Sequence, residues 1–200
     1  MTKHKRLISI AGTDIDRLSP MQLKESILKS EGRVICGQHL LFASAGLVRG
    51  VTNSELMFSF GADMVMLNTF NFDDDSKNLG LQGLSYRELR TLCRRPIGVY
   101  MGCPGADADV EDGLYDRGGM LATPKHVERA VEMGADFIVL GGNPGSGTRI
   151  ADVLATTARV KGCYGDDVFA GGSSPENIHQ LSISIKGMPY TYYRMASVNR

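Results

Sequence analysis

The chain has 200 residues, which is enough for one domain with a substantial hydrophobic core. It carries 22 basic and 22 acidic residues, so its charge gives no reason to expect nucleic acid or an anionic membrane as a partner. No apolar run is long enough to span a membrane. The four cysteines form no C-x-x-C pair, which argues against zinc or a disulfide framework and favours the reducing cytoplasm.

Five short apolar runs alternate with signals for helix starts along the chain. The first helix is predicted to begin at Pro20, because Ser19 precedes the proline and Gln22 stands three residues after the serine. Further helix starts are expected at 52–55, 85–88, 123–124, 150 and 174–175, and the apolar runs predict strands near 34–37, 64–67, 97–101, 137–140 and 167–170. This alternation predicts an α/β fold in which helices cover a parallel sheet.

A repeated unit indicates which α/β fold is present. Glu55 and the sequence GAD at 61–63, followed by an apolar run, match Glu128 and the sequence GAD at 134–136, followed by another. Such a repeat is typical of (β/α)8 TIM barrels, in which each unit has the same geometric part. An open doubly wound sheet is the alternative, and it is disfavoured because no G-x-G-x-x-G follows the first strand.

A closed TIM barrel has eight strands, whereas this sequence shows five apolar runs. Each further βαβ unit takes about 30 residues, so the chain has no room for three more. We therefore expect an incomplete, TIM-barrel-like parallel sheet of about five strands. It would form a single domain over residues 1–200, with residues 1–32 as an N-terminal helical lead-in. Such a sheet has unpaired edges, which makes a homo-oligomer an expected arrangement.

A glycine-rich segment follows the fourth predicted strand and precedes a helix. This order offers backbone N–H donors and a partial positive charge to an anion. The expected phosphate-binding residues are Gly141, Gly142, Asn143, Gly145, Ser146, Gly147 and Thr148, with Gly171, Gly172 and Ser173 after the fifth strand. A nucleotide-binding P-loop is disfavoured, because Thr148 and Arg149 stand where that motif has its lysine and hydroxyl residue. The alternative is a turn that uses glycine for its geometry alone.

Polar residues also follow the earlier strands. Ligands of such sheets bind at the carboxyl ends of the strands, so His39, Asn68 and Asp73 are candidate catalytic residues. Acids at 73–75 and 107–111 lie near the expected anion site, and Mg²⁺ bridges carboxylates to ligand oxygens. We therefore expect a Mg²⁺ ion there as a cofactor. The alternatives are a structural histidine at position 39 and a solvated loop at 73–75.

Most of the chain resembles a family of uncharacterised bacterial (β/α)8 barrels. The resemblance lies in IAGTDIDRLSPMQLKESI, GQHLLFASAGLVRGVTNSELMFSFGADMVMLNTFNFD, GVYMGCPGADADVEDGLYDRGGMLAT and GADFIVLGGNPGSGT. Members carry labels such as phosphoenolpyruvate phosphonomutase-like or haloacid dehalogenase-like hydrolase. The closing segment resembles the last strand and helix of such a barrel, which implies an internally shortened chain with its junction near 166–170. No catalytic residue is transferred from this resemblance.

Three classes of function remain open. The first is a TIM-barrel-type enzyme, phosphonomutase-like or hydrolase-like, that acts on a small phosphorylated or carboxylated metabolite with assistance from Mg²⁺. The second is a non-catalytic remnant of a truncated barrel, and the third is a ligand-binding module. In each class the expected partner is a small anionic metabolite, and neither nucleic acid nor a membrane is expected.

Overall fold

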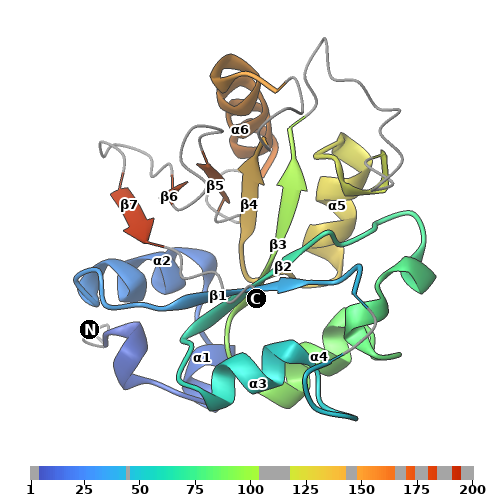
Figure 1. The fold of residues 1–200 in the computed structure, drawn as a ribbon. Helices are drawn as coiled ribbons and strands as arrows, with labels where there is room; N and C mark the ends of the chain where they lie inside the picture. Colours follow the sequence, from blue (N-terminus) through green and yellow to red (C-terminus); the bar gives the residue numbers. More distant parts are fainter. Residues whose placement is uncertain are drawn as a thin grey trace.

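The computed structural model describes residues 5–43, 46–103, 118–142 and 148–164, together with strand segments at 170–173, 180–183 and 191–194. One sheet contains β1 (Cys36–Leu40), β2 (Met64–Asn68), β3 (Ile97–Gly102), β4 (Ile138–Gly141), β5 (Ala170–Ser173), β6 (Gln180–Ile183) and β7 (Thr191–Arg194). The strands lie side by side in their sequence order (Figure 1). β1 to β5 are parallel, whereas β6 and β7 each run antiparallel to the preceding strand.

A helix connects each neighbouring pair of parallel strands. The connections are α3 (Asn53–Ser59), α4 (Tyr86–Cys93), α5 (Pro124–Glu132) and α6 (Ile150–Tyr164). All four pack on one face of the sheet, here called the outer face, which carries Val65, Val99 and Ile138. The strand order does not reverse and the helices stay on one face, which is the arrangement of a (β/α) barrel. The predicted α/β fold, an incomplete TIM-barrel-like sheet with five parallel strands, is therefore confirmed.

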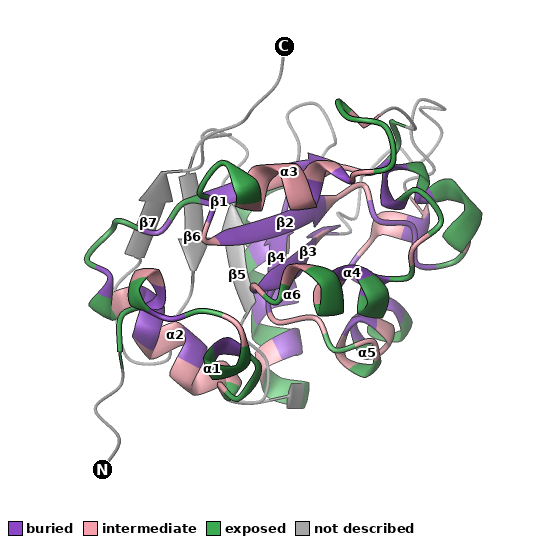
Figure 2. Ribbon diagram, turned by 90° about the horizontal axis from the view of Figure 1, so that it is seen from below, coloured by how far each residue is buried: buried purple, intermediate pink, exposed green. Residues whose placement is uncertain are grey.

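The opposite face of the sheet, here called the inner face, is covered by residues that precede β1. These residues form η1 (Leu7–Ser9), α1 (Thr13–Asp16) and α2 (Pro20–Lys29). Leu23 and Ile27 of α2 lie in one buried cluster with Met64, Met66 and Val139. Figure 2 shows α1 and α2 on the other side of β1 and β2 from α3, with the strands buried. The N-terminal helices therefore close the inner face near the amino-terminal ends of the strands.

The predicted helix starts are present at α2, α3, α4, α5 and α6. α2, α3 and α4 each begin with a reciprocal capping box, formed by the pairs Ser19–Gln22, Thr52–Glu55 and Ser85–Glu88. In each box the serine or threonine hydroxyl accepts from the backbone amide of the residue three positions later. The glutamine or glutamate side chain of that residue accepts in return from the backbone amide of the serine or threonine. These local hydrogen bonds explain why the sequence pattern located the helix starts so closely.

The two copies of GAD make equivalent turns between a helix and a strand. Gly61 and Gly134 have φ angles of 95° and 83°, a left-handed conformation that favours glycine. In both turns the amide of the next residue donates to a carbonyl five residues earlier, at 3.0 Å. This is the hydrogen bond of a glycine C-cap, and it directs the chain from the helix into the next strand.

The aspartate of each GAD copy then binds the start of the preceding strand. The Asp63 carboxylate accepts from the Ile35 amide at 2.9 Å, and the Asp63 amide donates to the Ile35 carbonyl at 2.8 Å. Asp136 makes the same two hydrogen bonds with Ile97, at 2.8 and 3.0 Å. The repeat in the sequence is therefore a repeat in structure, and it fixes the amino-terminal ends of neighbouring strands.

The last quarter of the chain differs from the prediction. β5 begins at Ala170, so Gly171, Gly172 and Ser173 lie within a strand and not in a loop after it; residues 165–169 lie outside the described residues. A strand also occupies 180–183, where a helix after 174–175 was expected. The proline signal was misleading there, because Leu181 and Ile183 alternate with serines in the period of two that is typical of strands.

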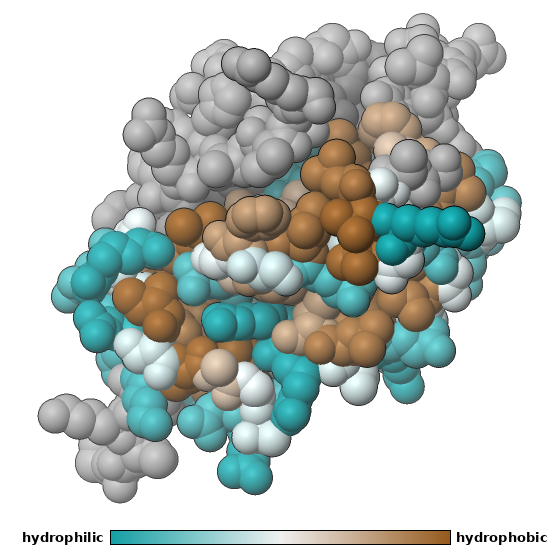
Figure 3. All heavy atoms as spheres, turned by 60° about the horizontal axis from the view of Figure 1, so that its bottom comes forward, coloured by the Kyte–Doolittle hydropathy of each residue, from teal (hydrophilic) through white to brown (hydrophobic). Residues whose placement is uncertain are grey.

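Among the helices that the structure describes, α3 stands at the end of the outer row. In a closed barrel each outer helix lies between two others, whereas α3 packs beside α4 at the β1 edge of the sheet. Phe60, directly after α3, is 85% exposed, and Leu92 of α4 is 58% exposed. Figure 3 views the molecule with the bottom of Figure 1, where α3 and α4 lie, turned forward, and it shows apolar surface on that face. Association of two copies through such a surface stays a prediction.

Candidate functional site

The carboxyl ends of β3, β4 and β5 meet at the edge of the sheet where barrel proteins bind ligands. Gly102 of β3 lies beside Gly141 of β4, and Gly141 lies beside Ser173 of β5. The Cys103 amide extends the ladder by donating to the Gly141 carbonyl at 2.8 Å. The two glycine segments singled out in the sequence are therefore adjacent, because β5 pairs directly with β4.

The segment after β4 is described at its two ends. Gly142 packs closely on Thr148: a Cβ atom at position 142 would lie 2.6 Å from the Cβ of Thr148, so a larger residue does not fit there. The Thr148 hydroxyl donates to the Cys103 carbonyl at 3.0 Å, which ties the start of α6 to the end of β3. Asn143, Gly145, Ser146 and Gly147 lie outside the described residues.

The first turn of α6 already contains one negative charge. The Asp152 carboxylate accepts from the Arg149 amide at 2.8 Å and from its guanidinium at 3.3 Å. The Arg149 amide and guanidinium hold the pKa of the Asp152 carboxyl below its ordinary value. A ligand at this end of the sheet would therefore meet a helix start whose dipole is partly compensated.

Asn68 ends β2 on the inner face, as expected for a residue of the site. Residues alternate between faces along a strand, and Asn68 is two positions beyond the inner-face residue Met66. The side chain is half-buried, and its Oδ1 accepts from the Thr69 amide at 2.7 Å. Asn68 lies beside Leu40 of β1 in the sheet register.

Thr69 adopts a strained backbone conformation directly after Asn68. Its φ angle is 62°, in the left-handed region that a β-branched residue rarely adopts. The Thr69 hydroxyl accepts from the amides of Leu41 and Phe42, at 3.0 and 3.2 Å, and donates to the Asn68 carbonyl at 2.6 Å. The two bonds to the amides hold the ends of β1 and β2 together. Strain of this kind is concentrated at functional sites in proteins.

Two further residues share the inner face with Asn68. Gln38 of β1 and Tyr100 of β3 alternate with outer-face neighbours and are half-buried. The side-chain amide of Gln38 makes no hydrogen bond with any residue that the structure describes. Tyr100 was not among the predicted site residues. The period of two along β3 was the signal that could have found it.

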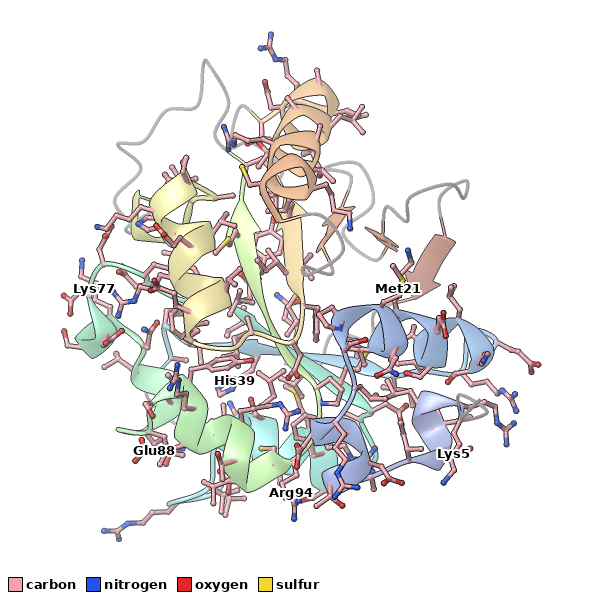
Figure 4. All side chains as sticks on the ribbon, turned by 180° about the vertical axis from the view of Figure 1, so that it is seen from behind. Lys5, Met21, His39, Lys77, Glu88 and Arg94 are labelled. Carbon is pink, nitrogen blue, oxygen red and sulfur yellow. The ribbon has the colours of Figure 1, made fainter. Side chains whose placement is uncertain are left out.

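His39 lies on the other face of the sheet from Asn68. It is 1% exposed, and its Nδ1 lies 2.8 Å from the hydroxyl of Ser54 at the start of α3. Nε2 has no partner among the described residues and faces Gly80, where an added Cβ atom would lie 2.8 Å away. Figure 4 shows His39 near the centre of the molecule, with the labelled charged residues Lys5, Lys77 and Glu88 toward its edges.

Burial lowers the pKa of His39 from 6.5 to about 4, so the ring is neutral at physiological pH. The candidate catalytic residues His39 and Asn68 do not lie together, because successive residues of a strand point to opposite faces and Gln38 takes the inner one. A catalytic role of His39 stays a prediction. The structural alternative describes His39 better: it is a packed residue between β1, α3 and the loop after β2.

Asp73 is bound to the start of α5. Its carboxylate lies 2.6 Å from the Lys125 ammonium and 3.1 Å from Nε2 of the buried His126. The hydrogen bond from Lys125, and to a lesser extent the one from His126, holds the pKa of the Asp73 carboxyl below its ordinary value. Nδ1 of His126 lies 2.8 Å from the Leu121 carbonyl, so the whole group fastens the loop after β2 to the turn before α5. This position does not bring Asp73 together with Asn68 or His39.

The acids at 73–75 point to separate partners. Asp74 accepts from the Ser76 amide and hydroxyl, at 3.0 and 2.6 Å, while Asp75 binds Arg129 at 2.8 Å. Among the residues that the structure describes, no group of three His, Cys, Asp or Glu side chains is placed to hold a metal ion. The other acidic stretch, 107–111, lies outside them. The expected Mg²⁺ ion stays a prediction.

Two further properties of the described residues bear on the expected partners and chemistry. The Cys103 thiol is 1% exposed, and burial raises its pKa to about 11, so it is a poor nucleophile. Of the helices that the structure describes, none combines the length and the apolar character needed to cross a lipid bilayer.

Comparison with known proteins gives one family and a distant structural likeness. No curated protein matches the chain. Among solved structures, the 3-hexulose-6-phosphate synthase from Salmonella typhimurium shares 16% sequence identity, with a TM-score of 0.41, over 80% of this chain and 62% of that one. The chain thus spans less than two thirds of that enzyme's length, and a likeness at this TM-score carries no argument about function.

The sequence profile of one protein family matches in two segments, residues 8–173 and 164–200. The overlap of the segments, 164–173, contains the junction that the resemblance to bacterial barrels implies. The phosphonomutase-like and hydrolase-like labels are tested by none of these matches and stay predictions. Because the profile covers nearly the whole chain, the protein belongs to the family described as Domain of unknown function (DUF7916).

Proposed function

We propose that the protein binds a small phosphorylated or carboxylated metabolite at the carboxyl ends of β3, β4 and β5, as a TIM-barrel-type enzyme does. The adjacency of Gly102, Gly141 and Ser173 carries this proposal. Gly141 and Ser173 end their strands with little or no side chain, which would let a ligand approach the backbone, whose N–H groups bind anionic oxygens. At Gly102 the Leu121 side chain takes this place, since an added Cβ atom would lie 3.2 Å from it.

Polar groups on the inner face support a ligand site at this edge. Gln38 and Asn68 are half-buried there and offer side-chain amide groups, and Tyr100 lies on the same face. The strained Thr69 and the tight contact between Gly142 and Thr148 hold the surrounding backbone in place. A preformed polar site of this kind is what binding of a small metabolite requires.

The reaction itself is left open by the arrangement of the side chains. His39, Asn68 and Asp73 lie in three different places, so the described residues do not present the expected catalytic group. This observation favours a ligand-binding module or a non-catalytic remnant as the second candidate function. Mg²⁺ would assist a phosphorylated ligand through carboxylates of the 107–111 stretch, and this too is part of the proposal.

Thermal unfolding in inorganic phosphate tests the proposal. At phosphate concentrations of about ten times Kd, a bound anion stabilises the folded protein by about 1.4 kcal/mol, which raises the melting temperature by a few degrees. The reference is sodium chloride of equal ionic strength, because a general salt effect raises both curves alike. If the melting temperatures in the two salts are equal at millimolar concentration, the proposal of an anion site is rejected.

Asn68→Asp locates the effect. The substitution keeps the shape of the side chain and adds a negative charge on the inner face. The affinity for phosphate should therefore fall by about tenfold or more, and the stabilisation by phosphate should fall with it. The matched control is Gln22→Glu in the capping box of α2, where glutamate is equally suited to its position. The control should keep the full response to phosphate. An equal loss in both variants would place the anion elsewhere.

A further inference from the structure

A hollow of about 660 Å³ lies on the outer side of the molecule, away from the strand ends of the candidate site. Its walls are the loop between β2 and α4, the first turn of α4 and the last turn of α5. The volume is in the range of small-molecule sites, which run from about 300 to 1,000 Å³. The hollow is therefore large enough for a ligand of its own.

The floor of the hollow is apolar. Phe70, Leu81 and Tyr86 are each at most 4% exposed and belong to the core of the outer face, and Leu84 and Met133 complete the floor. The Tyr86 hydroxyl is turned inward and donates to the Ile97 carbonyl at 2.5 Å. The floor thus offers a molecule carbon surface and no free hydroxyl.

The wall formed by the loop after β2 is fixed by its own hydrogen bonds. The Asn71 amide donates to the Asn78 side chain at 2.7 Å, and the Asn78 side chain donates back to the Asn71 carbonyl at 3.0 Å. Gln82 and Gly83 follow in left-handed conformations, with φ angles of 54° and 87°. The loop is therefore shaped before any ligand binds, which reduces the entropy lost on binding.

The charges at the rim do not cancel. Arg129 and Asp75 neutralise one another through an ion pair of 2.8 Å. The exposed Arg87 donates to the Glu132 carbonyl at 2.7 Å, and it forms no ion pair with any residue that the structure describes. A neutral carbonyl leaves the charge of the guanidinium uncompensated. The hollow thus combines an apolar floor with one surplus positive charge.

We propose that this hollow binds a small molecule with an apolar body and a single carboxylate, which Arg87 receives at the rim. A guanidinium suits a carboxylate because two of its N–H groups can donate to the two oxygens in parallel. A dianionic phosphate monoester is less suitable, because the Asp75 carboxylate lines the same hollow and only one positive charge is uncompensated. This site is separate from the one proposed at the strand ends.

Octanoate is the probe for a first experiment, with 1-octanol and octyl phosphate as comparators of equal chain length. Isothermal titration of the full chain should give saturable binding of octanoate at millimolar concentration or below. Octanol and octyl phosphate should bind more weakly. Methyl NMR should show the Met133 methyl group shifting as octanoate is added. Absence of saturable octanoate binding, or binding that leaves the Met133 signal unchanged, would overturn the proposal.

Arg87→Gln should weaken octanoate binding by about tenfold or more, because it removes a charged hydrogen-bond donor. Arg33→Gln is the control, since Arg33 is also exposed and follows α2, which covers the opposite face of the sheet. An equal affinity of the two variants would overturn the role of Arg87. Phosphate should not compete with octanoate, so failure of this site and failure of the proposed anion site are seen in separate measurements.

Discussion

The two ends of the parallel sheet are built differently, although the same strands form both. At the amino-terminal end, Asp63 and Asp136 each bind a strand start, and Arg90 binds Asp136 through two hydrogen bonds of 2.6 and 3.2 Å. At the carboxyl end, Gln38 and Asn68 stay half-buried on the inner face. The difference teaches that one end uses its polar groups to hold the fold together, while the other leaves polar groups partly exposed, and this second end is the one proposed to bind a ligand.

The carboxyl end itself divides into two faces. His39 lies near that end but points outward into the helix layer, where Ser54 binds it. Gln38, its neighbour in the chain, points to the inner face. A polar residue at the ligand-binding end therefore belongs to the candidate site only if it also lies on the inner face. Six substitutions at five positions can break or sharpen this comparison.

The largest effect is expected at the amino-terminal end. Asp136→Ala should lower the free energy of unfolding by about 3 kcal/mol, because it leaves the largely buried Arg90 with Asp16 as its one remaining carboxylate partner among the described residues and the Ile97 amide without an acceptor. Asp63→Ala should cost about 1–2 kcal/mol, since its ion pair with Arg95 is 3.9 Å long. Urea unfolding measures both. Equal losses would mean that the ion pair of Asp136 adds nothing to the turn.

The second effect is a dependence of stability on pH that comes from His39. The unfolded chain takes up a proton near pH 6.5, whereas the folded protein resists protonation of His39 down to about pH 4. The stabilisation is complete above pH 6.5 and is lost as the pH falls from there to about 4, by about 3 kcal/mol in total.

His39→Asn removes this titration and keeps a side-chain amide near the position of Nδ1. Its stability should therefore fall less than that of the wild type between pH 7 and pH 4. Asp73 does not confuse the measurement, because its lowered pKa affects stability only below its ordinary value of 3.8. A phosphate response that changes with His39→Asn at pH 7.5 would return His39 to the candidate site.

A third, smaller effect concerns the strain at Thr69. Thr69→Ala removes the hydroxyl that binds two amides but keeps the left-handed conformation. Thr69→Gly removes the hydroxyl and also the strain, so it should be about 1 kcal/mol more stable than the alanine variant. Thermal unfolding of the two variants gives the comparison. Equal stabilities would show that the backbone at Thr69 is unstrained.

The smallest effect is expected for Asp73→Asn. The side chain is 43% exposed, and its ion pair with Lys125 is screened by solvent, so stability should change less than in the other three cases. The phosphate response should stay the same, because Asp73 binds α5 and lies apart from the strand ends. Loss of that response without loss of stability would instead support a direct part in ligand binding.

Much of the fold could be predicted from local sequence patterns. The capping residues located the starts of α2, α3 and α4, since a cap forms between residues three apart in the chain. β2, β3 and β4 began within one residue of the predicted positions, because continuous apolar runs end sharply at turns. The GAD repeat predicted a barrel-like order of strands because both copies make the same local turn.

The candidate site was predicted in part. Gly141 and Gly142 were found because glycines at a strand end are visible in the sequence, and Asn68 was found by its place after an apolar run. His39 was expected in the site because it lies near the carboxyl end of a strand, but this expectation did not consider which face of the sheet its side chain occupies. Tyr100 was missed for the same reason, since only the packing of α2 against Met64 and Met66 shows which face is the inner one.

By itself, the sequence determined the βα units, their caps and the glycine turns, because each depends on hydrogen bonds between residues close in the chain. Only the tertiary structure decided that β5 pairs with β4, and so that Ser173 lies beside Gly141. It also decided which polar residues are sealed under the outer helices and which stay within reach of solvent. Strand pairing and the choice of face arise from burial of distant side chains against one another, and no local pattern encodes those contacts.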